Sequence, residues 1–208
     1  MHTKKFLTGG APISATSRVL IMIHGRGGSA EDILSLAPHL HVRDYTLIAP
    51  QATGGSWYPY SFLSPPAQNE PYLSSALAMI KDIVEDLHTQ GITDGNIYFL
   101  GFSQGACLTL EYITRNATRY GGAAVFTGGL IGDKLYTENY AGGDFKGTPV
   151  FIGSSDPDMH VPVARVQDST KLLEEKHASV LTKIYPNMGH TISQDEITQA
   201  NAHVFKMV

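Results

Sequence analysis

Ser103 is the residue whose surroundings most directly indicate nucleophilic chemistry. It lies in Gly101-Phe-Ser-Gln-Gly105, after the apolar run 97–100 and before the helix-like segment 106–112. A strand that passes into a helix around a serine leaves the hydroxyl exposed at a strained turn, and flanking glycines let strand and helix approach closely. The pattern alone is weak in a chain with 21 glycines, and the alternative is a solvated serine in a glycine-rich turn.

A histidine and an aspartate that such a serine would need follow later in the chain. Asp156 comes after the apolar run 149–152, and His190 comes after the run 181–185. An imidazole can take the serine proton, and a carboxylate on its other nitrogen holds the tautomer and stabilises the imidazolium. We therefore predict a catalytic triad of Ser103, Asp156 and His190.

Two nearby residues compete for these roles within Asp156-Pro-Asp-Met-His160. Asp158 is an alternative acid, and we prefer Asp156 because it lies closer to the end of its predicted strand. His160 is an alternative base to His190. Both aspartates and both histidines together suggest a metal site, but the pattern is weak and a serine nucleophile needs no metal. We predict neither a metal nor a cofactor.

A glycine-rich segment, His24-Gly-Arg-Gly-Gly28, follows the apolar run 19–23 and supplies a candidate oxyanion hole. A backbone turn there can direct N–H groups toward the serine. We assign one donor to the N–H of Arg26 and the other to the N–H of Gln104, the residue after the nucleophile. The Arg26 side chain either binds an anion or supports the fold, and we favour the structural role.

Residues 51–71 differ in kind from the rest of the chain because they combine prolines with aromatic side chains. Proline density argues against regular structure, whereas the aromatics argue against disorder. We predict an ordered pocket wall that receives an apolar acyl group, with Gly25, Trp57 and Phe62 as substrate-binding residues. For Trp57, anchoring of the loop to the core is an equal alternative.

Strand-length apolar runs alternate with helical patterns along the chain, which predicts one α/β domain over residues 1–208 with a mostly parallel sheet and helices on both faces. The carboxyl ends of parallel strands meet at one edge, so the three triad residues are expected together there. The predicted strands are 19–23, 45–49, 97–100, 123–126, 149–152 and 181–185. Helices are predicted over 73–87, 106–118 and 163–177. A further helix is predicted to begin at Ser29, and the last one after Ser193, where Glu196 completes a capping box.

Composition narrows the classes of function. A net charge of −4 without a basic cluster argues against nucleic-acid binding. No apolar run approaches the ~20 residues of a membrane span, and the first ten residues do not resemble a signal peptide, so we expect a cytoplasmic protein. Cys107 is the only cysteine and is expected in the core. The oligomeric state stays open, a homodimer included.

The chain resembles the carboxylesterase/phospholipase family of α/β-hydrolases, which includes acyl-protein thioesterases. The order Ser, Asp, His is the order of that fold. The resemblance implies a compact esterase without a large cap domain, the triad given above, and Trp57 near the acyl pocket. The matching segments are His24-Gly-Arg-Gly-Gly28, Ser56-Trp57-Tyr58, Gly101-Phe-Ser-Gln-Gly105, Thr127-Gly-Gly-Leu130, Gly153-Ser-Ser-Asp156, Val161-Pro162 and Met188-Gly-His190.

Two departures from the family pattern bear on the substrate. The family often has Asp-Pro-x-Val-Pro at the acid, whereas here Pro-Asp-Met-His separates Asp156 from Val161. Arg26 replaces an apolar residue of the acyl-protein thioesterases, so we prefer a small ester to a protein thioester. The prediction is a serine hydrolase of carboxylic esters that forms an acyl-enzyme, with thioesters and lysophospholipids as further candidates. A non-catalytic binding protein and a small serine peptidase are the alternatives.

Overall fold

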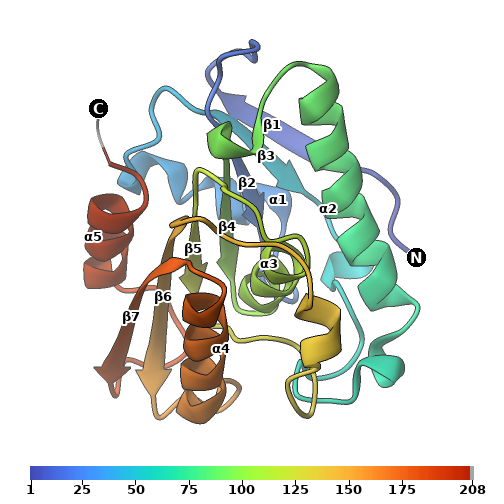
Figure 1. Cartoon of the computed structure of the whole chain (residues 1–208), viewed down its shortest axis with the longest axis vertical. Coiled ribbons are helices and arrows are strands. Elements are labelled where there is room, and N and C mark those ends of the chain that lie inside the picture. Colours follow the sequence, from blue (N-terminus) through green and yellow to red (C-terminus); the bar gives the residue numbers. More distant parts are fainter. Residues whose placement is uncertain (207–208) are drawn as a thin grey trace.

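A seven-stranded sheet, ordered β1-β3-β2-β4-β5-β6-β7, runs through this computed structural model, which describes residues 1–206 (Figure 1). Edge strand β1 is antiparallel to β3, and every other neighbouring pair is parallel. The strands are β1 (Phe6–Gly10), β2 (Val19–Ile23), β3 (Thr46–Pro50), β4 (Ile97–Phe102), β5 (Gly122–Phe126), β6 (Pro149–Asp156) and β7 (Ser179–Pro186).

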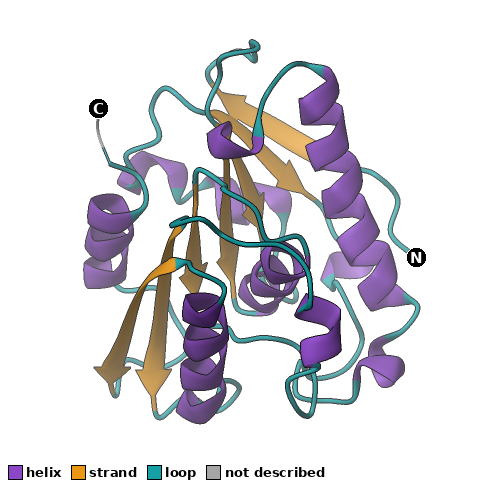
Figure 2. Ribbon diagram, viewed as in Figure 1, coloured by secondary structure: helices purple, strands orange, loops and turns teal. Residues whose placement is uncertain are grey.

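Helices cover both faces of the sheet, as the sequence predicts (Figure 2). Helices α2, α3 and α4 contribute to the apolar cluster on one face, and α1 and α5 contribute to the cluster on the other. The helices are α1 (Ala30–Leu34), α2 (Tyr72–Thr89), α3 (Gln104–Arg115), α4 (Val163–Glu175) and α5 (Gln194–His203). Short 3₁₀ turns occupy Ala37–His39, Thr53–Gly55, Pro66–Asn69, Asp94–Asn96 and Thr137–Tyr140. Within the described residues, no helix has both the length and the apolar character needed to cross a membrane.

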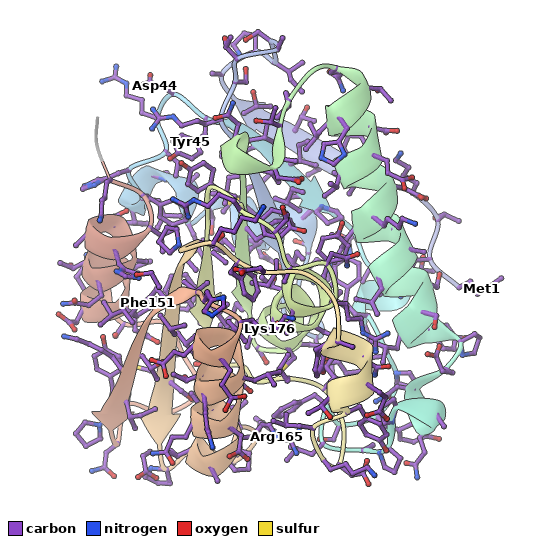
Figure 3. All side chains as sticks on the ribbon, in the orientation of Figure 1. Met1, Asp44, Tyr45, Phe151, Arg165 and Lys176 are labelled. Atoms are coloured by element: carbon purple, nitrogen blue, oxygen red, sulfur yellow. The ribbon has the colours of Figure 1, made fainter. Side chains whose placement is uncertain are left out.

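The central strands are apolar throughout because both of their faces are buried. In β2, Val19 and Ile23 pack into the cluster with α2 and α3, whereas Leu20 and Met22 pack into the cluster with α1 and α5. Successive side chains alternate between the two faces of a strand, so a continuous apolar run fills both cores. Figure 3 shows side chains in the space between the sheet and the helices. Phe151 of β6, labelled there, belongs to the cluster with α1 and α5.

The six predicted strands are all present, and one strand was missed. Strand β1 has the sequence Phe-Leu-Thr-Gly-Gly and alternates between exposed and half-buried positions at the sheet edge. Because such a strand buries little, it carries no apolar run to reveal it. Strand β6 also continues beyond the predicted 149–152 and ends at Asp156, which pairs with Pro186 of β7.

Both predicted serine N-caps are confirmed. Ser29 accepts a hydrogen bond from the N–H of Asp32, and Ser193 accepts one from the N–H of Glu196, each within a complete capping box. The second box starts α5 three residues after His190. The local sequence therefore defines where the chain turns from the loop that follows β7 into the last helix.

Candidate active site

Ser103 occupies the sharp turn between β4 and α3, with φ 54° and ψ −117°. Its N–H donates to the carbonyl of Phe126 (3.0 Å), and its own carbonyl accepts from the N–H of Cys107 (3.0 Å). A left-handed conformation is strained for a residue with a Cβ and persists only where neighbouring bonds hold it. A Cβ at Gly105 would collide with the carbonyl of Ile23, which explains the glycine there. The predicted strand–turn–helix geometry around Ser103 is thus present.

His190 links this serine to a carboxylate. Its Nε2 lies 2.7 Å from Oγ of Ser103, and its Nδ1 lies 2.9 Å from Oδ2 of Asp158. The ring packs against Phe102 with 5.5 Å between centroids, and 23% of the side chain is exposed. Strand β4, the loop after β6 and the loop after β7 therefore bring one serine, one aspartate and one histidine into hydrogen-bond contact.

The prediction of Asp156 as the acid is wrong, because Asp158 is the residue that contacts His190. Asp156 is the last residue of β6 and is exposed. Since β6 remains paired with β7 up to that position, the turn that returns toward His190 begins only after it. The side chain that the turn delivers to the imidazole is that of Asp158, which is completely buried.

A signal for Asp158 was present in the sequence. In the pattern Asp-Pro-x-Val-Pro, the acid stands three residues before the valine, and three residues before Val161 stands Asp158. The dipeptide Asp156-Pro157 imitates the start of that pattern two residues too early. The longer spacing that we inferred from Asp156 is therefore not a departure, because the acid and Val161-Pro162 have the usual separation.

Asp158 is held as a carboxylate by hydrogen bonds on both of its oxygens. Burial favours the neutral acid, but the N–H groups of His160 (2.7 Å) and Val161 (2.9 Å) donate to Oδ1, and His190 contacts Oδ2. These contacts outweigh burial and hold the pKa of Asp158 below its ordinary value. The site thus has an ionised group on the far side of the imidazole.

His160, the rival base, does not contact the serine. Its ring meets the ring of His190 edge-on, with 4.9 Å between centroids, and it lines the mouth of the cavity described below. Between residues 1 and 206, no group of three or more histidine, cysteine, aspartate or glutamate side chains is placed to hold a metal ion.

The two predicted oxyanion donors lie at turns next to Ser103. Gln104 is the first residue of α3, where an N–H has no partner within its helix. The N–H of Arg26 donates no backbone hydrogen bond within residues 1–206. Gly25, the neighbour of Arg26 in the chain, comes close to the nucleophile: a Cβ added there would stand 3.4 Å from Cβ of Ser103. Both N–H groups stay the predicted donors for a substrate oxygen.

Sequence reasoning missed the role of the Gln104 side chain. Its Oε1 accepts from the N–H of Trp57 (2.8 Å), and its Nε2 donates to the carbonyl of Tyr58 (2.8 Å). The side chain thereby ties the aromatic loop, residues 51–71, to the turn between β4 and α3 that carries Ser103. Because these partners are more than forty residues away in the chain, no local pattern could have indicated them.

The Arg26 side chain supports the loop of residues 51–71, in agreement with the structural role that we favoured, and its remaining N–H donors stay available to a ligand. Its Nη1 donates to Oγ of Ser56 (3.0 Å) and to the carbonyl of Pro59 (2.9 Å), and its Nη2 donates to the carbonyl of Tyr60 (2.7 Å). Arg26 and Gln104 therefore hold the same loop from two sides.

Trp57 anchors this loop to the core, and its predicted place at the acyl pocket is wrong. The side chain is 0% exposed and does not line the cavity. Its Nε1 donates to the carbonyl of His24 (2.8 Å), and the two rings lie 5.0 Å apart. Burial of an indole with its N–H paired makes a firm anchor. His24 is itself a packed structural residue, because its Nε2 accepts from the N–H of Ala52 (3.1 Å).

A cavity of about 530 Å³ opens beside Ser103 and His190. Of the three predicted substrate-binding residues, Phe62 lines it, whereas Gly25 and Trp57 do not. Cys107 also lines it, and burial raises the pKa of that thiol to about 12, which makes it unreactive. The remaining lining residues are Arg26, Tyr58, Pro59, Tyr60, Ser61, Leu63, Gln104, Met159, His160 and Val161.

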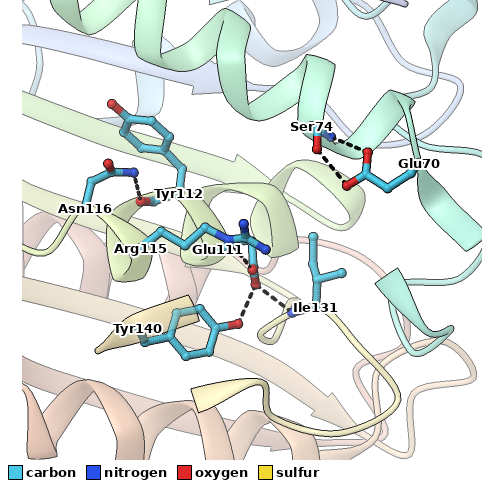
Figure 4. A network of polar contacts seen from close by, with 8 residues as sticks. All are labelled: Glu70, Ser74, Glu111, Tyr112, Arg115, Asn116, Ile131 and Tyr140. Atoms are coloured by element: carbon cyan, nitrogen blue, oxygen red, sulfur yellow. Dashed lines mark hydrogen bonds and ion pairs between the residues drawn. The ribbon is translucent and has the colours of Figure 1, made fainter. Parts of the chain in front are cut away.

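The buried carboxylate of Glu111 ties α3 to the segment 131–140 (Figure 4). Its Oε1 accepts from Arg115 (2.7 Å), and its Oε2 accepts from the N–H of Ile131 (3.1 Å) and the hydroxyl of Tyr140 (2.7 Å). One residue on, the N–H of Gly132 donates to the carbonyl of Phe62 (2.7 Å). The helix that begins at the nucleophile is thus connected to the residue that lines the pocket.

Comparison with known proteins agrees with this fold. A family model described as phospholipase/carboxylesterase matches residues 10–208. Acyl-protein thioesterase 1 of Kluyveromyces lactis is 30% identical over 198 residues, covering 86% of this chain and 87% of that protein. A probable carboxylesterase of Arabidopsis thaliana, named SOBER1-like, is 28% identical over 195 residues, covering 86% of this chain and 74% of that protein.

A solved structure agrees over almost the whole chain. The phospholipase/carboxylesterase from Dyadobacter fermentans is 52% identical, covers 99% of this chain and 98% of its own, and superposes with a TM-score of 0.96. These homologues support a hydrolase with the α/β-hydrolase fold, and no cap domain is evident among residues 1–206. From the family match and these relatives, the chain belongs to the phospholipase/carboxylesterase family of α/β-hydrolases.

Proposed function

We propose that the protein hydrolyses carboxylic esters through Ser103, His190 and Asp158, with an acyl-enzyme as intermediate. The observation that carries the proposal is the continuous relay in which Nε2 of His190 lies 2.7 Å from the serine Oγ and Nδ1 lies 2.9 Å from the carboxylate. A serine hydroxyl is a weak nucleophile until a base removes its proton, and this contact supplies the base.

In the first half of the reaction, Oγ of Ser103 attacks the acyl carbon while Nε2 of His190 takes the hydroxyl proton. The ionised Asp158 stabilises the imidazolium without itself taking the proton. The N–H groups of Arg26 and Gln104 donate to the oxyanion of the tetrahedral intermediate. His190 then gives its proton to the leaving oxygen, and the bond between that oxygen and the acyl carbon breaks.

In the second half, a water molecule attacks the acyl carbon of the ester formed with Ser103. His190 takes a proton from the water and returns it to Oγ as the carboxylic acid leaves. The same three side chains thus serve both halves, and the enzyme is regenerated.

The acyl group that this site would receive is apolar. Tyr58, Phe62, Cys107 and Val161 line the cavity and are each less than a tenth exposed. Desolvating an apolar chain against such residues is favourable, whereas burying a charge there is costly. A thioester is a second candidate substrate, because the mechanism is the same for a thiol leaving group and one relative is an acyl-protein thioesterase.

Replacing the nucleophile tests the proposal. Ser103→Ala is expected to abolish turnover of p-nitrophenyl esters and labelling by a fluorophosphonate, while circular dichroism stays that of the wild type. Ser14→Ala, on an exposed turn away from the site, serves as the control and is expected to keep both. Substantial turnover by folded Ser103→Ala would exclude the mechanism.

Substrate panels separate the remaining alternatives. Oxygen esters and thioesters of graded chain length give the acyl preference and the preferred leaving atom. Matched p-nitroanilides test for peptidase activity, which the proposal expects to be much weaker than ester hydrolysis. A protein that binds without catalysis would resist labelling and hydrolyse none of them.

A further inference from the structure

We propose that the natural substrate carries an anionic oxygen group, a carboxylate or a phosphate, on its leaving group, and that the guanidinium of Arg26 recognises it. This inference rests on the ester hydrolysis proposed above and adds the chemical class of the alcohol or thiol.

The charge of the active-site cavity is the first support. Its lining contains Arg26, His160 and His190 but no aspartate or glutamate. Asp158 does not line it: its side chain is completely buried, with both oxygens engaged by His190 and by backbone N–H groups. Arg26 is the one permanently charged side chain of this lining, and its positive charge attracts an anionic ligand although the whole chain carries a net charge of −4.

The bonding of Arg26 is the second support. Three of its five N–H donors go to neutral oxygens on the aromatic loop, and within residues 1–206 it forms no ion pair. The loop contacts hold the guanidinium in place without neutralising it. A charge that is already positioned loses little conformational entropy when an anion binds, and a planar guanidinium matches carboxylate and phosphate oxygens.

The division of the cavity places the anion on the leaving group. The apolar lining residues Tyr58, Phe62 and Val161 are buried, whereas Arg26, His160 and Met159 are exposed. In an acyl-enzyme, the acyl chain stays inside on Ser103, but the leaving group must depart to solvent past the exposed rim. The buried part therefore suits the acyl chain, and the exposed rim, which carries Arg26, meets the alcohol or thiol.

A matched pair of esters tests this inference. The substrates are 4-(butanoyloxy)benzoate and the neutral 4-(butanoyloxy)benzamide, with kcat/KM of each divided by its rate of alkaline hydrolysis to correct for leaving-group reactivity. 4-(Butanoyloxy)phenyl phosphate replaces the carboxylate by a phosphate and shows which anion is preferred. We expect the normalised kcat/KM of the wild type to be about tenfold or more higher for an anionic ester, which corresponds to the free energy of one hydrogen bond to a charged group. This preference is expected to fall when salt is added, because salt screens the charges.

Variants assign the preference to Arg26. Arg26→Met is expected to lose the preference for the anionic ester, and Arg26→Lys is expected to keep part of it. The measured quantity is the ratio of kcat/KM for the two esters, so any effect of the substitution on catalysis in general cancels. Arg43→Met, at an exposed arginine that does not line this cavity, removes the same net charge and is expected to keep the full preference. The salt dependence of the wild-type preference for the anionic ester tests the inference even if a variant does not fold.

Four results would overturn the inference. Equal normalised rates for the charged and neutral esters would do so while leaving ester hydrolysis intact. A preference that survives in Arg26→Met would exclude the assigned residue. A stronger preference for the anion on the acyl side, measured with phenyl hydrogen glutarate against phenyl pentanoate, would exclude its placement. Absence of both ester turnover and fluorophosphonate labelling would remove the proposed function itself and this inference with it.

Discussion

Oδ2 of Asp158 lies 2.9 Å from Nδ1 of His190, whereas Asp156, two residues earlier, ends strand β6 with its side chain exposed. The two aspartates are chemically identical and nearly adjacent in the chain. Only one of them is delivered to the imidazole, because β6 stays paired with β7 as far as Asp156 and the chain turns back only afterwards.

This difference predicts opposite results for two matched substitutions. Asp158→Asn keeps the shape of the side chain but removes the charge that stabilises the imidazolium, so kcat on a p-nitrophenyl ester is expected to fall by about 10³- to 10⁴-fold. Asp156→Asn is expected to stay within about twofold of the wild type. Equal loss in both variants, or a larger loss in Asp156→Asn, would reverse the assignment.

Stability at low pH should depend on the same carboxylate. Because hydrogen bonds hold the pKa of Asp158 below its ordinary value in the folded chain, the unfolded chain binds that proton more readily. Its contribution to stability is therefore present above the unfolded pKa of about 3.9 and is lost as the pH falls through the lower folded pKa. Urea unfolding between pH 5 and pH 2.5 is expected to show the gap between the wild type and Asp158→Asn narrowing toward acid. Parallel curves would contradict this linkage.

The side chain of Gln104 is expected to matter although its backbone N–H is the group assigned to catalysis. Gln104→Ala leaves the N–H of Trp57 and the carbonyl of Tyr58 without these partners, and each buried group left unpaired costs about 1–3 kcal/mol. We expect the free energy of unfolding to fall because the loop loosens. We also expect KM to change by a larger factor than kcat, because the backbone N–H assigned to the oxyanion remains. Gln68→Ala, at an exposed glutamine of the same wall, is the control. An unchanged KM in Gln104→Ala would show that the loop does not depend on this side chain.

Glu111 is expected to contribute strongly to folding. Glu111→Ala leaves the N–H of Ile131 and the hydroxyl of Tyr140 without this partner, and each buried group left unpaired costs about 1–3 kcal/mol. The exposed i,i+4 pair of Lys81 and Glu85 gives a matched comparison, since Glu85→Ala is expected to cost about 0.5 kcal/mol or less. Chemical denaturation of both variants measures the difference, and similar losses would show that the network of Figure 4 is energetically minor.

Local features of the sequence were sufficient for six of the seven strands, for the helix starts and for two members of the relay. Ser103 was identified because its turn is encoded by neighbouring residues, with an apolar strand before it, a helix after it and glycines at the points of close approach. His190 was identified because it follows a strand on the carboxyl edge of a parallel sheet, where loops converge. Such features depend on residues that are close together in the chain, so a pattern can reveal them.

The acid and the shape of the pocket were decided by tertiary structure. Asp158 rather than Asp156 meets His190 because of how far two strands remain paired, and Trp57 is buried behind the wall because His24 accepts its N–H. Arg26 and Gln104 hold the loop of residues 51–71 through contacts that span thirty residues or more. The sequence by itself determined which chemical groups arrive at the edge of the sheet. Their contacts depend on packing between distant segments, which is why only the folded chain shows which carboxylate meets the imidazole and which aromatic ring faces the cavity.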